Sequence, residues 1–261
     1  MQPVVYALDS RGVATITLNR PKVGNAYDGA MIEALLGAMD ALSTDPKLRV
    51  VLLTGNGKHF QAGADLKWIR EVRNASAEEN ERVSRATAEA VDRLNRLPVP
   101  TVALVQGGCF GGGTGMIAAC DVVVAADNAV FSISEVRWGL TAAIIIPQLS
   151  DAISARQLRR YALTGERFDA AEARRIGLVH EVVPLDKLSE TGGRIAAQLL
   201  ENGPQAIAET KACILESAWG GFDRATFDAL SASHAAKRRS EEAGEGLASF
   251  AEKRPAAWRT S

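Results

Sequence analysis

The sequence predicts an α/β fold with a β-rich first half and a helical second half. Before Pro147, short β-branched apolar runs alternate with stretches of helical periodicity, and after it nearly all periodic segments are helical. The 261 residues are 47% hydrophobic and 23% charged, which provides enough apolar material for a large core. Because no linker rich in proline, glycine and serine divides the chain, we expect both halves to share one core.

The first half predicts strands and two helices. β-branched residues mark the strand segments, the first two of which form a hairpin, and apolar residues recur three or four apart in the helical segments. Asp28 is a suitable N-cap for the first helix. The second helix is rich in charge, so we expect a solvated face. The strand segments are 4–8, 13–18, 49–54, 100–105, 121–126 and 129–133, and the helical segments are 31–42 and 74–97.

The second half predicts helices joined by one short strand over 179–183, before Pro184. The helical segments are 148–155, 155–163, 170–176, 185–200, 204–216, 223–237 and 240–252.

Charge balance and cysteine usage exclude several classes of protein. The 30 basic and 31 acidic residues give a formal net charge of -1, so there is no general attraction to nucleic acid or to an anionic membrane. The three cysteines and three histidines lack metal-ligand spacing, so we expect no metal, and Cys109 and Cys120 should be buried small hydrophobes. Without a leader or a membrane-spanning apolar run, we expect a cytoplasmic protein.

A glycine-rich stretch, QGGCFGGGTGMIAACD at Gln106 to Asp121, is the strongest local signal for function. It follows a β-branched run and leads into a small-residue segment, Thr114 to Cys120, which predicts a strand, a glycine turn and a helix start. Glycines let the backbone approach a ligand closely, and the free N–H groups at a helix start attract negative charge.

Three common glycine motifs do not fit this stretch. A dinucleotide-binding GxGxxG would follow the first strand, whereas this cluster lies more than a hundred residues into the chain. The GxxxxGK[ST] phosphate loop is absent, and a GxSxG nucleophile elbow would need a serine where Thr114 stands. The remaining interpretation is a turn whose backbone N–H groups form an oxyanion hole.

Six motifs follow one another along nearly the whole chain. They are LNRPK at 18–22, AGAD at 62–65, GGG at 111–113 with AACD at 118–121, SE at 134–135, LTGERFDAAEARRIGLVHEVVP at 163–184 and FAEKRPAAW at 250–258. Taken in this order, they resemble the enoyl-CoA hydratase/isomerase, or crotonase, family. The resemblance implies a crotonase-like spiral of ββα turns with a helical C-terminal trimerisation region. We therefore expect a core over 1–195 and a helical region over 196–261 that serves oligomerisation, as a homotrimer or dimer of trimers, and forms an active-site lid.

The resemblance also implies an acyl-CoA substrate and assigns roles to particular residues. The N–H groups of Ala64 and Gly112 would form the oxyanion hole for the thioester oxygen. Because CoA is part of the substrate, no separate cofactor is expected. Lys22 and Lys67 are candidate phosphate partners. The other residues expected to bind CoA or substrate are Val23, Ala62, Gly63, Asp65, Leu66, Gly111, Gly115 and Trp138.

The acid/base position departs from the two-carboxylate hydratases of the family. Those enzymes carry one glutamate two residues after the GGG run and another after the next strand, but here the first position is Gly115 and only the second, Glu135, is acidic. We expect Glu135 to act alone as acid and base in hydration. The alternatives are a Δ3,Δ2-enoyl-CoA isomerase, a general enoyl-CoA hydratase, or a non-catalytic RNA- or CoA-binding member.

Three stretches narrow the resemblance: GADLKW at 63–68, GGGTG at 111–115 and SEVRWGLTAA at 134–143. They look most like the branched-glutaconyl hydratases, which act on 3-methylglutaconyl-CoA in leucine breakdown or isohexenylglutaconyl-CoA in terpene breakdown. We expect Gly115 to leave room for a second substituent at Cβ of the substrate. Arg137 is a candidate partner for a substrate carboxylate, and Trp138 is expected to shape the acyl pocket.

Overall fold

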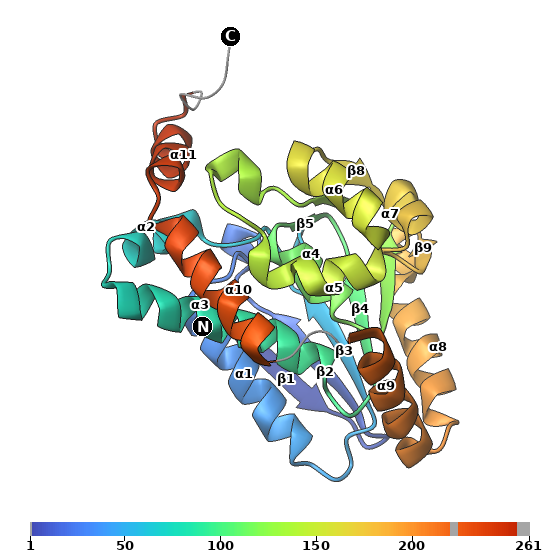
Figure 1. Ribbon diagram of the computed structural model, residues 1–261. Helices are drawn as coiled ribbons and strands as arrows, with labels where there is room; N and C mark the ends of the chain where they lie inside the picture. Colours follow the sequence, from blue (N-terminus) through green and yellow to red (C-terminus); the bar gives the residue numbers. More distant parts are fainter. Residues whose placement is uncertain (1, 220–223, 255–261) are drawn as a thin grey trace.

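The structure is a computed structural model that describes residues 2–219 and 224–254. A six-stranded sheet lies at its centre (Figure 1). Its first two strands are antiparallel, as the hairpin prediction required, and all the other pairs are parallel. In spatial order the strands are β1 (Val4–Leu8), β2 (Val13–Leu18), β3 (Val50–Gly55), β4 (Thr101–Val105), β6 (Val122–Ala126) and β9 (Glu181–Val183).

The central strands of the large sheet are buried on both faces because their side chains alternate between two apolar cores. In β4, Ala103 and Val105 join the larger core together with α1 (Gly29–Ser43) and α3 (Ala77–Asn95). Val102 and Leu104 point the other way, into a core shared with α8 (Leu188–Leu200). A parallel strand covered on both faces reads as a continuous β-branched run, which explains the clear sequence signal here.

A second, three-stranded sheet was not predicted in full. It contains β5 (Gly108–Phe110), β7 (Val130–Ser132) and β8 (Phe168–Asp169). The glycine-rich stretch therefore includes a strand, whereas we expected only a turn between β4 and the helix. Gly107, at φ +58, turns the chain from one sheet into the other, and a three-residue strand containing glycine carries little β-propensity.

The predicted N-terminal cap of α1 is confirmed, since the Asp28 side chain accepts a hydrogen bond from the Met31 N–H at 2.9 Å. No helix among residues 2–219 and 224–254 has the length and apolar character that a membrane crossing needs. The remaining helices are α2 (Leu66–Arg73), α4 (Gly112–Ala118), α5 (Ile146–Ala152), α6 (Ser154–Thr164), α7 (Ala170–Ile176), α9 (Pro204–Trp219), α10 (Arg224–Arg238) and α11 (Glu241–Ala251), with 3-10 turns η1 (Pro21–Val23), η2 (Glu135–Trp138), η3 (Ala143–Ile145) and η4 (Leu185–Lys187).

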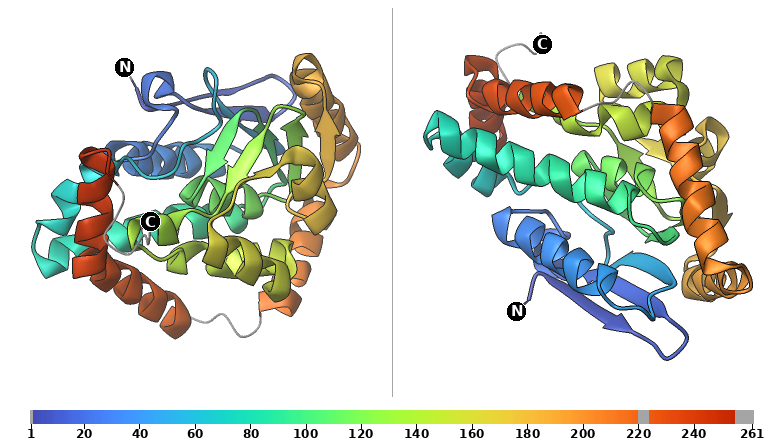
Figure 2. Two further views of the ribbon diagram at one scale, coloured as in Figure 1. Left: turned by 90° about the horizontal axis from the view of Figure 1, so that it is seen from above. Right: turned by 60° about the horizontal axis from the view of Figure 1, so that its bottom comes forward.

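The predicted boundary between residues 195 and 196 is wrong, because it falls inside α8. Ile195 and Ala196 both pack into the core beneath the large sheet, so α8 belongs to the core unit. Of the later helices, α10 and α11 lie at the opposite end of the molecule, where α10 packs against α3 and α11 packs against α2 and η2. Figures 1 and 2 show α8 and α9 at one end and α10 and α11 at the other.

Candidate active site

Successive turns of the spiral bring three segments of the chain into register. Gln61 pairs in parallel with Cys109, and Cys109 pairs in parallel with Phe131. Three residues beyond each of these positions lie Ala64, Gly112 and Ser134, the last of which precedes Glu135. The fold therefore stacks both predicted oxyanion-hole peptides and the predicted acid/base residue on consecutive turns.

Two glycines allow these turns to approach each other closely. Gly63 and Gly111 have φ of +87 and +50, which L side chains rarely adopt. A Cβ at Gly63 would lie 3.2 Å from the Phe110 carbonyl oxygen, and a Cβ at Gly111 would lie 3.0 Å from Oε1 of Glu135. Side chains at either position would separate the three segments.

The backbone N–H groups of Ala64 and Gly112 are free to bind a ligand. The amides beside Ala64 are used, since Tyr27 donates to the Gly63 oxygen and Asp65 donates to the Tyr27 oxygen. Gly112 is the first residue of α4, so its N–H has no partner within the helix. Within the described residues neither amide donates to a protein acceptor. Two free donors on adjacent turns can stabilise a developing oxyanion.

Glu135 is a carboxyl group held away from water. It begins η2, and its Oε2 atom is buried without a hydrogen-bond partner among the described residues. Burial raises the pKa of Glu135 from 4.5 to about 7, although hydrogen bonds from its own and the Ser134 backbone N–H groups oppose the shift. A carboxyl group with a pKa near neutrality can both take up and return a proton at physiological pH.

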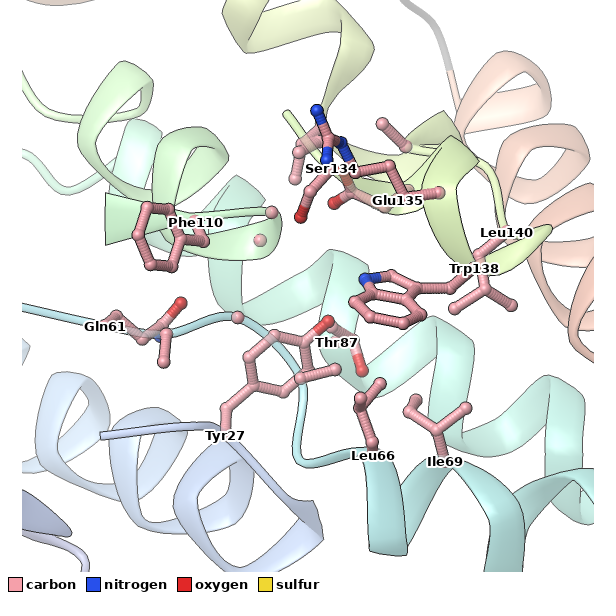
Figure 3. Close-up of a pocket in the computed structure, with 18 of the residues that line it drawn as sticks. Tyr27, Gln61, Leu66, Ile69, Thr87, Phe110, Ser134, Glu135, Trp138 and Leu140 are labelled. Atoms are coloured by element: carbon pink, nitrogen blue, oxygen red, sulfur yellow. The ribbon is translucent and has the colours of Figure 1, made fainter. Parts of the chain in front are cut away.

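These groups open into a cavity of about 600 Å³. Figure 3 shows Phe110, Ser134, Glu135, Trp138 and Leu140 along one wall, and Gln61, Tyr27, Leu66 and Ile69 along the other. The walls are largely apolar, and Glu135 is the only acid among the described residues that line them. The apolar lining explains why desolvation dominates its pKa.

Most of the predicted site residues line this cavity, but five do not: Lys22, Val23, Asp65, Lys67 and Gly115. Lys22 and Val23 are exposed on η1, which adjoins the cavity wall because the Ala62 N–H donates to the Gly24 oxygen at 2.9 Å. The Asp65 side chain instead caps α2 and forms a salt bridge with Arg20 at 3.0 Å. The predicted residues that line the cavity are Ala62, Gly63, Ala64, Leu66, Gly111, Gly112, Glu135, Arg137 and Trp138.

The room expected beside Gly115 is not there. Gly115 is buried and does not line the cavity, and a Cβ at this position would lie 2.1 Å from Cγ2 of Ile145. The side chain of Ile145 fills the space, so the glycine accommodates packing between α4 and η3 rather than a substrate branch.

Arg137 lies at the cavity, where its Nε donates to the Gly165 oxygen at 2.8 Å. The next residue, Trp138, contacts Phe250 edge to face, with 4.7 Å between ring centroids. This contact brings α11 against the cavity wall, and Ser249, Phe250 and Lys253 contribute to the lining.

Several lining residues escaped the sequence reasoning, among them Tyr27, Thr87, His234 and Arg238. One signal was present in α3, which we expected to be only a solvated charged helix. Asn80, Ser84 and Thr87 are four and three residues apart, so they share one helical face, and all of them are buried. A buried polar stripe on a helix indicates partners elsewhere in the chain.

Two of the cysteines belong to the core and not to a metal site. Cys109 and Cys120 are buried, as predicted, and burial raises the pKa of Cys109 and brings that of Cys120 to about 12. Over the described ranges, no three His, Cys, Asp or Glu side chains come together as a metal site would need.

Comparison with known proteins gives a consistent picture. Residues 9–261 match the family model described as enoyl-CoA hydratase/isomerase. The chain is 34% identical to a mevalonyl-coenzyme A hydratase of Aspergillus fumigatus, covering 100% of this chain and 96% of that protein. It is 31% identical to a mitochondrial Δ(3,5)-Δ(2,4)-dienoyl-CoA isomerase of Dictyostelium discoideum, covering 94% and 87%. An enoyl-CoA hydratase structure from Shewanella pealeana superposes with a TM-score of 0.80 at 36% identity, covering 98% and 96%.

Proposed function

This chain belongs to the enoyl-CoA hydratase/isomerase family and is an enzyme of the enoyl-CoA hydratase type. We propose that it hydrates its substrate with Glu135 as the single acid/base group. The observation that carries this proposal is that Glu135 is the only acid among the described cavity-lining residues. It also faces the turn that carries a free oxyanion-hole amide, since its Oε1 lies beside Gly111.

In this mechanism the thioester oxygen accepts hydrogen bonds from the N–H groups of Ala64 and Gly112. The Glu135 carboxylate takes a proton from water as the water oxygen forms a bond to Cβ. The π electrons of the double bond move toward the thioester, and the two amides stabilise the enolate oxygen. The protonated Glu135 then gives its proton to Cα, so one carboxyl group completes the addition of water.

For the substrate, we propose a branched, carboxylated enoyl-CoA such as isohexenylglutaconyl-CoA or 3-methylglutaconyl-CoA. The support is the resemblance of the segments 63–68, 111–115 and 134–143, together with a cavity of about 600 Å³ with apolar walls. Hydration rates on these two thioesters and on crotonyl-CoA would test the proposal. A preference for crotonyl-CoA would instead support a general enoyl-CoA hydratase.

The decisive variant for the reaction is Glu135→Gln, which keeps the side-chain size but cannot accept the proton. We expect kcat to fall by about 10²- to 10⁴-fold while a saturated acyl-CoA still binds. Substantial hydration by the variant would contradict the role of Glu135. Mass spectrometry of the wild-type products separates the alternatives, because hydration adds the mass of water and Δ3,Δ2 isomerisation leaves the mass unchanged.

We also propose, from the family resemblance, that the chain assembles into a homotrimer or a dimer of trimers. Light scattering would reveal either state as three or six times the mass of one chain.

A further inference from the structure

A buried arginine without an acidic partner lies in the cavity wall. Arg238, the last residue of α10, is 1% exposed and lines the cavity. One of its terminal nitrogens donates to the Asn80 main-chain oxygen at 3.0 Å and to the Ser84 hydroxyl. Its Nε is buried without a partner, and within the part of the chain that the structure describes no acid forms an ion pair with it.

Arg238 remains a cation despite its burial. Burial lowers the pKa of Arg238 to about 10, which still leaves the guanidinium protonated at neutral pH. The neighbouring His234, which lies 3.2 Å from the Ser84 hydroxyl, contributes no charge because burial lowers its pKa to about 3. The cluster therefore carries an uncompensated positive charge, an arrangement that is costly unless an anion joins it.

The cluster also has hydrogen-bonding capacity to spare. The unpartnered Nε–H of Arg238 belongs to the planar donor fork that matches a carboxylate. Asn80 is fully buried, and neither atom of its side-chain amide has a hydrogen-bond partner among the described residues. Unsatisfied buried polar groups beside a cavity indicate a ligand that would satisfy them.

Arg238 lies within electrostatic range of Tyr27, another residue of the cavity lining. Burial is the main cause of the raised pKa of Tyr27, the charge of Glu135 adds to the rise, and the charge of Arg238 opposes it. Figure 3 shows this hydroxyl directed toward Thr87. Ser84, which contacts Arg238, is one turn before Thr87 on α3, a distance of about 4.5 Å along the helix axis.

From these contacts we propose that Arg238 binds a carboxylate at the far end of the acyl chain, so that the substrate class is an ω-carboxylated 2-enoyl-CoA. The acyl chain passes Glu135 and Tyr27, and its terminal carboxylate reaches the guanidinium. This inference rests on the proposed function. It assigns the substrate carboxylate to the buried Arg238 instead of the exposed Arg137. A desolvated charge pair discriminates more strongly than one in contact with water.

The test compares 2-enoyl-CoA thioesters of five to eight acyl carbons that end in a carboxylate with thioesters of equal length that end in a methyl group. We expect the wild-type protein to favour the carboxylates in kcat/KM at one or two chain lengths. Arg238→Met should lower this carboxylate-to-methyl ratio by about 100-fold, chiefly through KM. Arg238→Lys, which keeps the charge, should restore part of the preference.

Two further variants serve as references. Arg224→Met removes a 67% exposed arginine from the same helix, away from the cavity, and should leave the ratio unchanged. Arg137→Met tests the alternative partner. A large fall in the carboxylate-to-methyl ratio in Arg137→Met, with no fall in Arg238→Met, would overturn the assignment.

Binding of saturated ω-carboxyl and ω-methyl acyl-CoAs, measured by calorimetry, gives the same comparison without turnover. Equal wild-type rates and affinities for both series would reject the carboxylate site while leaving the hydratase proposal intact. Failure to hydrate any member of either series would instead reject the proposed function.

Discussion

At the residue scale, the environment of Glu135 predicts how activity depends on pH. The carboxylate form must take the proton from water, and burial raises the pKa of Glu135 to about 7. We therefore expect kcat/KM to fall as the pH drops through 7, approaching about tenfold per pH unit. A profile of kcat/KM from pH 5 to 9 measures this, and a flat profile down to pH 5 would show that the group is not desolvated in this way.

The raised pKa of Glu135 also predicts how the free energy of unfolding depends on pH, and the trend is opposite to that of activity, so stability provides an independent check. Because the pKa rises from 4.5 in an unfolded chain to about 7 in the fold, the protonated form favours folding. This contribution is fully present below pH 4.5 and is lost as the pH rises through 7. Glu135→Gln should therefore be more stable than wild type at pH 8, by up to about 3 kcal/mol, with little gain at pH 4.5. Urea unfolding at both pH values measures the difference.

At the scale of elements, the stacked turns explain which parts of the site could be predicted. Ala64, Gly112 and Glu135 follow strands or glycine turns that have local sequence signals, and the spiral then places them together. The surroundings depend on contacts between distant segments. Ile145 fills the space beside Gly115 from thirty residues further along, and Arg238 reaches Ser84 across more than 150 residues.

The family resemblance therefore suggested the oxyanion-hole and acid/base residues, whereas neither it nor local patterns predicted the shape or charge of the far end of the cavity. The error at Gly115 has the same origin. A missing side chain creates space only if no neighbour packs into it, and protein interiors are closely packed. The short strand β5 was missed because its identity depends on pairing with β7 and not on its own propensity.

The first turn of α4 provides a test of the oxyanion hole. Proline is tolerated at the first position of a helix and has no N–H, so Gly112→Pro removes one predicted donor. A Cβ at Gly112 would lie 2.7 Å from the Tyr27 ring, and Gly112→Ala is the matched control because it brings this contact but keeps the N–H. We expect kcat of the proline variant to be about 10²-fold below that of the alanine variant.

Steady-state kinetics on the same thioester would measure both variants. An equal fall in kcat in the two variants would mean that crowding of Tyr27, and not the missing N–H, slows the reaction.

At the scale of the whole molecule, the C-terminal helices meet the first half of the chain around the cavity. Arg70 on α2 donates to the Leu247 oxygen of α11 at 3.1 Å, and Phe250 contacts Trp138. Gly246 lets α11 approach η2, since a Cβ there would lie 2.2 Å from the Trp138 oxygen. The same chain therefore contributes both η2, which carries Glu135, and the helix α11 that packs against it. That α11 forms a lid over the site stays a prediction.

Substituting Gly246 tests whether α11 closes the site or only stabilises the fold. In Gly246→Val the new side chain would meet the Trp138 backbone, and such overpacking costs about 1–3 kcal/mol. If substrate binds only when α11 is docked, the apparent affinity falls with the docked fraction, so KM should rise about tenfold while kcat at saturation changes less. Gly37→Val in α1 is the matched control, because a Cβ there would meet nothing within 4 Å. A lower melting temperature with an unchanged KM would show that α11 only stabilises the fold and does not close the site.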